Sequence, residues 1–207
     1  MNTFRFFTVL LVLAFLTGGE AVSQANKTMT TLSYSPSLAL GTTSDFAGDF
    51  HWRGVTFEAR RFLDRQLSVG FLAGWQVLSQ KTEEPLSVPN GTLSGTQVRT
   101  MNTFPFMLTG SYYFSKSEQE VRPYLTAAVG MTYIDQRWDV GVVSFGTYNW
   151  HFTAAPEFGV IIPAGDVDVL LAAMYTYAFD SGNTVWGADD NTQQYIAFKL
   201  GLVWSRF

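Results

Sequence analysis

The segment Leu67-Ser68-Val69-Gly70-Phe71-Leu72-Ala73-Gly74-Trp75-Gln76-Val77-Leu78 carries the strongest structural signal of this chain. Its apolar residues Leu67, Val69, Phe71, Ala73, Trp75 and Val77 alternate with Ser68, Gly70, Gly74 and Gln76. Successive side chains of a β-strand point to opposite faces, so this period of two predicts a strand with one bulky apolar face and one face of small or polar residues.

Seven other segments show the same alternation, which predicts eight strands in all. We place the eight strands at about residues 31–41, 52–63, 67–78, 103–115, 122–133, 150–162, 167–179 and 195–205. Charged residues obey the pattern as well, because Glu58 and Arg60 fall on the small and polar face of the second strand. Every strand is therefore expected to have an apolar face and a protected polar face.

The N-terminal residues have the composition of a secretion signal. Arg5 supplies the positive charge, residues 6–16 form an apolar run, and Ser23-Gln24-Ala25 is a small-x-small cleavage site. We expect cleavage after Ala25, with a signal peptide over 1–25 and one domain over 26–207; Gly19-Glu20-Ala21 is a weaker alternative site. A membrane anchor is disfavoured, because a spanning helix needs about 20 apolar residues.

Composition narrows the class of protein further. The mean hydropathy is +0.08, and 47% of the residues are hydrophobic, yet no later run is long enough for a membrane helix. A net charge of −4 without a basic cluster argues against nucleic acid as a partner. The absence of cysteine excludes a disulfide framework and a cysteine-ligated metal centre, and no cofactor is expected.

These patterns together predict an eight-stranded antiparallel up-and-down transmembrane β-barrel, an all-β fold, in the outer membrane of a Gram-negative bacterium. A sheet in hydrocarbon must close on itself, because unpaired backbone groups there cost several kcal/mol each. The structural alternative is a soluble lipocalin-like barrel, which reverses every face. That alternative is disfavoured because it exposes the inward charges and crowds Trp and Phe into a small interior.

The lengths of the connectors predict the orientation of the barrel. Residues 63–66, 115–121 and 163–166 are short and turn-like, whereas 42–51, 79–102, 134–149 and 180–194 are longer. Short turns are expected on the periplasmic side, together with both termini, and long loops outside. Two aromatic girdles are expected, at Trp75, Phe104, Tyr133, Trp150 and Tyr177 on the outer rim and at Phe62, Tyr112, Phe114 and Trp204 on the inner rim.

Three prolines interrupt the predicted strands. Pro36, Pro105 and Pro156 each remove a backbone donor from the sheet. We expect bulges or local irregularity at these positions.

Four charged residues, Glu58, Arg60, Glu157 and Lys199, are predicted to project into the lumen from three strands. Opposite charges in a poorly hydrated interior must pair or incur a large desolvation cost. An eight-stranded barrel has room for little more than its own side chains, so an ion-pair plug is favoured over an exchanging gate. The two carboxylates do not imply hydrolysis, because nothing places a substrate between them.

Two histidines are candidate catalytic or metal-binding groups. His151, Thr153 and Glu157 suggest an acyl hydrolase, but they share one strand face, and about 20 Å would separate His151 from Glu157. A hydrogen-bonded lumen histidine is the preferred interpretation. His51 with Asp45 and Asp49 could form a weak metal site, but a solvated loop is preferred.

The chain resembles the outer-membrane β-barrel domain family, of the eight-stranded OmpA/OmpX-like type found in Bacteroidetes. The resemblance is carried by residues 57–63 with 67–70, 104–108 with 112–114, 122–125 with Gly130, and the closing segment 201–207. It implies that Phe207 is a recognition signal for the barrel-assembly machinery, although Phe207 is out of phase with the lipid-facing residues of its strand. A bulge near Ser205 would restore the phase.

We expect a structural or surface-interaction role rather than an enzyme. The alternatives are a narrow channel or carrier for small or apolar solutes and, less favoured, a lipid-modifying enzyme. The expected partners are outer-membrane lipid, lipopolysaccharide and the assembly machinery, and the expected state is a monomer. Residues 79–102 read as a mobile surface loop in which no residue pattern names a ligand.

Overall fold

The computed structural model of the chain describes residues 27–48, 50–83, 86–88, 91–93, 96–117, 120–181 and 191–206. The predicted signal peptide with its cleavage site at Ala25, the loop residue Asp49 and the terminal Phe207 lie outside the described residues. Within these ranges, no helix is long and apolar enough to cross a membrane.

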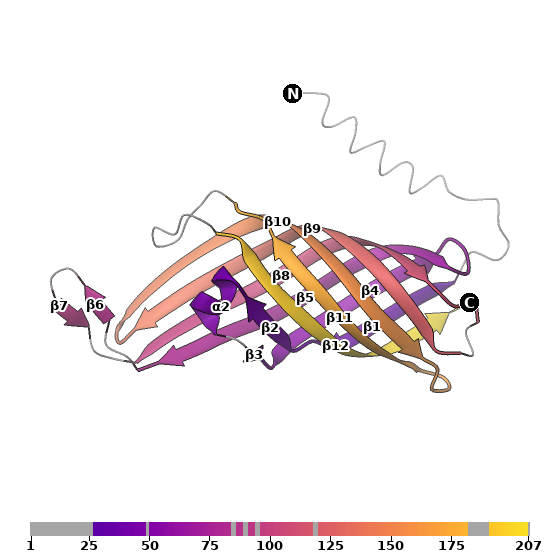
Figure 1. Cartoon of the computed structure of the whole chain (residues 1–207), viewed down its shortest axis with the longest axis horizontal. Helices are drawn as coiled ribbons and strands as arrows, with labels where there is room; N and C mark the ends of the chain where they lie inside the picture. Colours follow the sequence, from indigo (N-terminus) through magenta and orange to yellow (C-terminus); the bar gives the residue numbers. More distant parts are fainter. Residues whose placement is uncertain are drawn as a thin grey trace, which may run out of the picture.

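The strands close into a ring (Figure 1). They are β1 (Thr28–Tyr34), β2 (Ser37–Leu40), β3 (Phe50–His51), β4 (Arg53–Phe62), β5 (Leu67–Thr82), β6 (Leu86–Val88), β7 (Gly91–Leu93), β8 (Gln97–Tyr113), β9 (Arg122–Val140), β10 (Val143–Ile162), β11 (Asp168–Ala178) and β12 (Gln193–Arg206). The order β1-β4-β5-β8-β9-β10-β11-β12 is antiparallel throughout, and β1 pairs with β12 to close it. The predicted eight-stranded barrel is confirmed.

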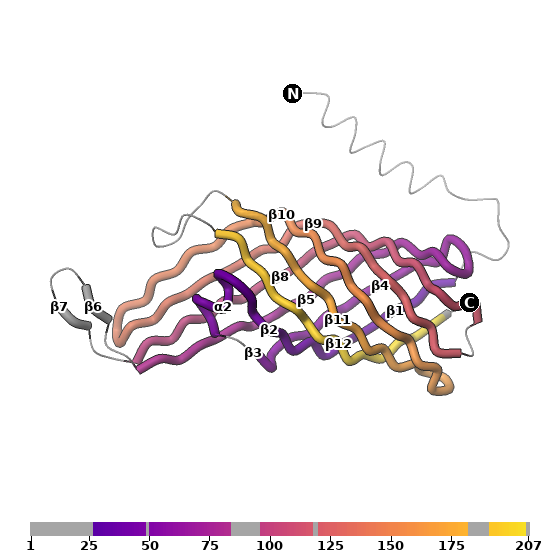
Figure 2. Tube along the Cα trace, viewed as in Figure 1, coloured from indigo at the N-terminus to yellow at the C-terminus, as the bar shows by residue number. Residues whose placement is uncertain are grey.

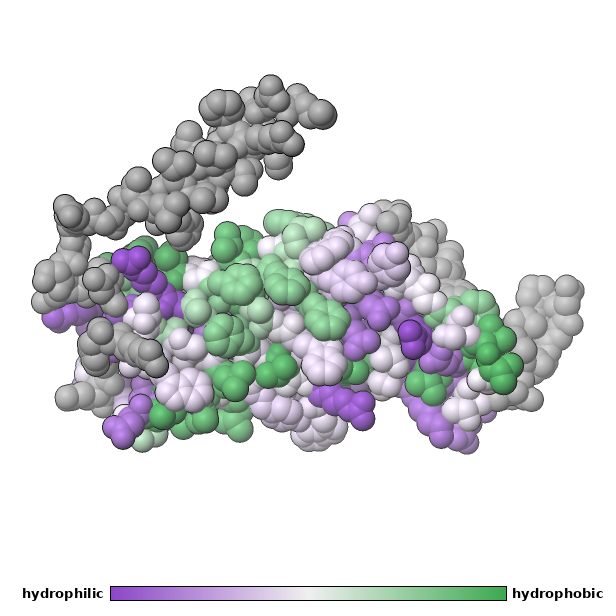
Figure 3. Space-filling view, turned by 180° about the vertical axis from the view of Figure 1, so that it is seen from behind, coloured by the Kyte–Doolittle hydropathy of each residue, from purple (hydrophilic) through white to green (hydrophobic). Residues whose placement is uncertain are grey.

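The two faces of the strands are those expected from the alternation. On β5, Phe71 and Trp75 are exposed on the outside, whereas Ser68 and Gln76 are buried in the lumen. Figure 3 shows apolar residues gathered over the middle of one face of the barrel, with hydrophilic residues toward both ends. The outer surface therefore carries the apolar belt of a membrane-embedded barrel.

Four aromatic residues of the outer rim form a continuous row across β5, β8, β9 and β10. The ring centroids of Trp75 and Phe104 are 6.3 Å apart, those of Phe104 and Tyr133 are 6.2 Å apart, and those of Tyr133 and Trp150 are 5.3 Å apart. The expectation for Phe62 was wrong. Its side chain is 4% exposed and points into the lumen, because it has the parity of the inward residues of β4.

The sheet extends beyond the barrel on one side, which corrects the predicted loops. Residues 134–149 were expected to form a long loop, but β9 and β10 pair from Arg122 and Ile161 up to Val140 and Val143. A tight turn at Gly141, with φ of 59°, joins the two strands. The tube in Figure 2 shows β5, β8, β9 and β10 running together past the other strands. The short connectors between β4 and β5, β8 and β9, and β10 and β11 agree with the prediction.

The first long connector is also structured. Residues Thr42–Ala47 form a short helix, α2, and β3 follows it. Thr43 and Ala47 of α2 are buried, so the helix turns into the mouth of the barrel rather than away from it (Figure 1).

Each of the three prolines perturbs the sheet locally. Pro36 separates β1 from β2, and opposite it the register changes by one residue: Tyr34 faces Val55, but Ser37 faces His51. Two residues, Trp52 and Arg53, therefore lie opposite Pro36, which is a β-bulge. Near Pro105 and Pro156, pairing with one neighbouring strand lapses and resumes in the same register, without a bulge.

Candidate functional site

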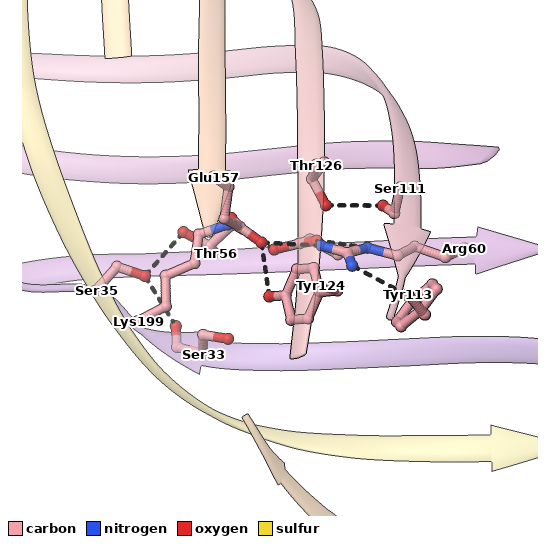
Figure 4. A network of polar contacts seen from close by, with 11 residues as sticks. Ser33, Ser35, Thr56, Arg60, Ser111, Tyr113, Tyr124, Thr126, Glu157 and Lys199 are labelled. Carbon is pink, nitrogen blue, oxygen red and sulfur yellow. Dashed lines mark hydrogen bonds and ion pairs between the residues drawn. The ribbon is translucent and has the colours of Figure 1, made fainter. Parts of the chain in front are cut away.

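Four charged side chains meet in the lumen. Glu58 and Arg60 come from β4, Glu157 from β10 and Lys199 from β12, and each residue is at most 2% exposed. Strand periodicity brings them together, since each occupies an inward position at a similar height of the barrel. We call these four residues the charge cluster; it unites all the predicted lumen charges, of which Figure 4 labels Arg60, Glu157 and Lys199.

Each carboxylate of the charge cluster binds both cations. Lys199 Nζ donates to Glu58 Oε1 at 2.6 Å and also to Glu157 Oε2. Arg60 Nε donates to Glu58 Oε2 at 3.0 Å, and its Nη2 donates to Glu157 Oε1 at 3.0 Å and again to Glu58. Two negative and two positive charges therefore neutralise each other in a closed ring of contacts, as buried charges require.

Two tyrosines complete the polar contacts of the charge cluster. Tyr124 Oη donates to Glu157 Oε1 at 2.7 Å, and Tyr113 Oη accepts from Arg60 Nη1 at 3.2 Å. The Arg60 guanidinium also lies 4.8 Å from the centre of the Tyr124 ring (Figure 4). The period of two along its strand predicts that Tyr124 faces inward, but the contacts of the two tyrosines with the charges could not be read from the sequence.

Apolar layers lie on both sides of the charge cluster. Toward the short turns, the cluster borders a layer formed by Met29, Phe62, Tyr113, Tyr124, Ile161, Leu170 and Val203. Toward the long connectors, the next layer is formed by Leu72, Met107, Ala128, Ala155, Met174, Tyr195 and Ala197. Charges enclosed in this way are separated from water at both ends of the lumen.

The helix α2 covers the mouth of the barrel. Ala47 packs in a third layer with Ala39, Leu78, Met101, Ile134 and Ala178. Thr43 Oγ1 donates to Gln193 Oε1 at 2.9 Å and accepts from the backbone of Gln194 at 2.8 Å. Arg99 donates to the backbone oxygen of Asp45 at 3.2 Å and lies over the rings of Phe46 and Trp138. This cap was not anticipated from the sequence.

Both histidines make hydrogen bonds to the backbone that stabilise the fold. His151 is 2% exposed, and its Nδ1 lies 2.9 Å from the backbone oxygen of Phe179. Thr153 donates instead to Thr132 and Glu157 belongs to the charge cluster, so the structure does not unite the three residues.

His51 does not lie in a solvated loop, which corrects that expectation. It is 6% exposed on β3, and its Nδ1 accepts from the backbone N–H of Ser79 at 3.2 Å. Its pairing in the sheet beside β2 explains the burial. Among the described residues, no group of three or more His, Cys, Asp or Glu could hold a metal ion.

Comparison with known proteins rests on structure alone. No family model matches the chain, and no curated protein matches it in sequence. The fold is similar to that of Ail, the attachment invasion locus protein of Yersinia pestis, at 10% identity and a TM-score of 0.54, covering 88% of this chain and 100% of Ail. A second Ail structure, in complex with the heparin analogue sucrose octasulfate, matches at 10% identity and a TM-score of 0.52, with the same coverage. Neisserial surface protein A matches at 11% identity and a TM-score of 0.47, covering 86% of this chain and 94% of that protein.

The closed ring of strands, the apolar outer belt and this likeness of fold define the class. The chain is an integral membrane β-barrel of the eight-stranded outer-membrane type.

Proposed function

We propose that the protein is an outer-membrane barrel with a structural or surface-interaction role, whose lumen the charge cluster closes. The observation that most strongly supports this proposal is that four mutually neutralised charges are completely buried between two apolar layers. An open aqueous path along the axis would hydrate these groups, whereas the side chains here contact each other. The cap formed by α2 adds a further obstruction at the long-connector end.

The part of the sheet beyond the barrel supports the surface-interaction role. Val142 at the tip of the β9–β10 hairpin is fully exposed, and Tyr148 is 70% exposed. Val143 and Phe145 on the same hairpin are 46% and 42% exposed. Apolar groups that project past the membrane belt are typical of a contact surface for another macromolecule.

Several further features belong to this proposal. Long connectors face the cell exterior, and both ends of the barrel chain lie on the periplasmic side. The protein is a monomer of the Bacteroidetes-type OmpA/OmpX-like family, is surrounded by lipopolysaccharide, and is inserted by the assembly machinery through Phe207. It is not an enzyme; incubation with lipopolysaccharide would release no fatty acid.

One observation favours a narrow channel as the second candidate. Each carboxylate of the charge cluster contacts both Lys199 and Arg60. A pair can therefore exchange without leaving a buried charge unpartnered, which is the requirement for an ion gate.

Conductance across planar bilayers separates these two functions. The plug predicts that the wild-type barrel shows no steady opening. A steady current that Lys199→Ala or Glu58→Gln abolishes would overturn the plug and establish the gate. Lys81→Ala is the matched control, because Lys81 pairs with Glu83 on the exposed surface at 3.1 Å.

A further inference from the structure

Two adjoining grooves hollow the outer wall of the barrel beside the seam between β1 and β12. The larger has a volume of about 530 Å³ and is lined mainly by apolar residues, among them Leu32, Tyr34, Leu200 and Leu202. The smaller, about 420 Å³, is lined by Arg53, Trp75, Val77 and Asn102. Gly54 and Val55 line both, so the two form one continuous groove, the seam groove, which runs from β11 across β12, β1, β4 and β5 to β8.

The two ends of this seam groove differ in chemistry. Tyr34 pairs with Val55, and Leu32 pairs with Phe57. Phe57 is four residues along β4 from Arg53, so Leu32 lies four residues along the sheet from the level of Arg53. At 3.3 Å per residue, the groove runs roughly 13 Å from a cationic end into the apolar belt. A charged head followed by an apolar tail is the shape of a membrane lipid.

Arg53 faces outward beside the bulge opposite Pro36. It has the outward parity of Val55 on β4, and the extra residue of the bulge turns the neighbouring Trp52 outward as well, where Trp52 is 69% exposed. Among the described residues, Arg53 makes no ion pair, in contrast with Arg60 in the lumen and Lys81 on the surface. No acidic residue lines either part of the seam groove.

A second donor lies at the same level of the wall as Arg53, on the other side of Val77. Trp75 Nε1 donates to Asn102 Oδ1 at 3.3 Å, and this bond orients the Asn102 amide. Since the oxygen accepts from the indole, the amide nitrogen is left to donate toward the seam groove. Two donors at one end, one of them a guanidinium, suit the oxygens of a phosphate group.

We propose that the seam groove binds one phosphorylated glycolipid, the lipid A part of lipopolysaccharide. A phosphate of the lipid contacts Arg53 and Asn102, and one acyl chain lies along Val55, Leu32 and Leu202. The choice of lipid A over a phospholipid rests on the proposed orientation, which places Arg53 in the outer leaflet.

Native mass spectrometry of the purified full-length barrel, with defined lipids added to the detergent, tests this proposal. The expected result is one retained lipid A per barrel, with at least about tenfold weaker retention of dephosphorylated lipid A. Arg53→Gln should weaken lipid A retention by a similar factor, and Val55→Trp should fill the groove and do the same.

Matched controls sit on β9, none of whose residues lines the seam groove. Arg137→Gln removes another exposed outward arginine, and Val129→Trp enlarges another lipid-facing valine; both should leave retention unchanged. Equal retention of lipid A and its dephosphorylated form, or equal loss with Arg53→Gln and Arg137→Gln, would overturn the site. These measurements are independent of conductance, so a failed plug and a failed lipid site can be told apart.

Discussion

Lys199 Nζ lies 2.6 Å from Glu58 Oε1, although the two residues are 141 positions apart in the chain. Lys199 is on the last strand and Glu58 on β4, and β1 lies between those strands in the ring. The contact therefore spans the seam at which the first and last strands meet. The charge cluster fills the lumen and also joins the two ends of the closed sheet.

Lys199→Met should destabilise the barrel strongly. It leaves Glu58 and Glu157 with Arg60 as their shared cation, and breaking a buried pair typically costs about 3–5 kcal/mol. Urea unfolding in lipid vesicles, followed by tryptophan fluorescence, measures the change. Lys81→Met breaks an exposed pair and should change the free energy of unfolding by less than about 1 kcal/mol. Equal effects of the two variants would contradict the role given to the charge cluster.

Replacing the whole charge cluster should be tolerated better than removing one member. The variant combines Glu58→Leu, Arg60→Met, Glu157→Leu and Lys199→Met with Tyr113→Phe and Tyr124→Phe, so that no hydroxyl is stranded. Well-packed apolar side chains often match or exceed a buried ion-pair network in stability. The same urea titration should give a stability above that of Lys199→Met. A lower stability would show that the charges do more than fill space.

Arg99→Ala should loosen α2 without unfolding the barrel. The change removes the hydrogen bond to Asp45 and the stacking on Phe46 and Trp138. Amide hydrogen exchange in residues 42–47 should accelerate roughly tenfold, corresponding to about 1.4 kcal/mol. Arg137→Ala is the control, and exchange in β5 should not change. Unaltered exchange in α2 would mean that its buried residues hold it alone.

The limits of the apolar belt can be tested with two valines. Val129 lies on the outside between the aromatic rows and is 50% exposed, whereas Val142 lies at the tip of the projecting hairpin. Val129→Arg should destabilise the barrel by about 2–4 kcal/mol, the cost of Arg or Lys at the bilayer midplane. Val142→Arg should be close to neutral in the same vesicle assay. A neutral Val129→Arg would place the membrane elsewhere.

The outer face of the barrel could be predicted because a lipid-facing surface imposes a strict period of two. Residues 134–149 were missed because Asp135, Arg137 and Asp139 lie beyond the belt, where no apolar face is required. The strand there is held by backbone pairing, which leaves no hydropathy signal. The inward position of Phe62 could have been predicted from the sequence, since Phe62 has the same parity as Glu58 and Arg60.

The composition of the lumen could be predicted only in part. Parity placed the four charges inside, but their mutual contacts depend on the stagger of strands that are distant in sequence. Leu72 and Met107 break the alternation by pointing inward, and that departure was a signal of a filled lumen. The helix α2 could not be predicted from the sequence, because a six-residue segment forms a helix here only through its packing on the apolar layer at the mouth of the barrel.

The central claim, a lumen closed to water, can be tested most directly with a single cysteine. The chain has no cysteine, so an introduced thiol reacts without background. Ser35 is fully buried beside the charge cluster and contacts Thr56 at 2.8 Å, whereas Ser44 on α2 is only half-buried. The measurement is the labelling rate of Ser35→Cys by a small cationic thiol reagent in folded barrels. A closed lumen predicts rapid labelling of Ser44→Cys and none of Ser35→Cys until the barrel is unfolded; rapid labelling of Ser35→Cys in the folded state would contradict it.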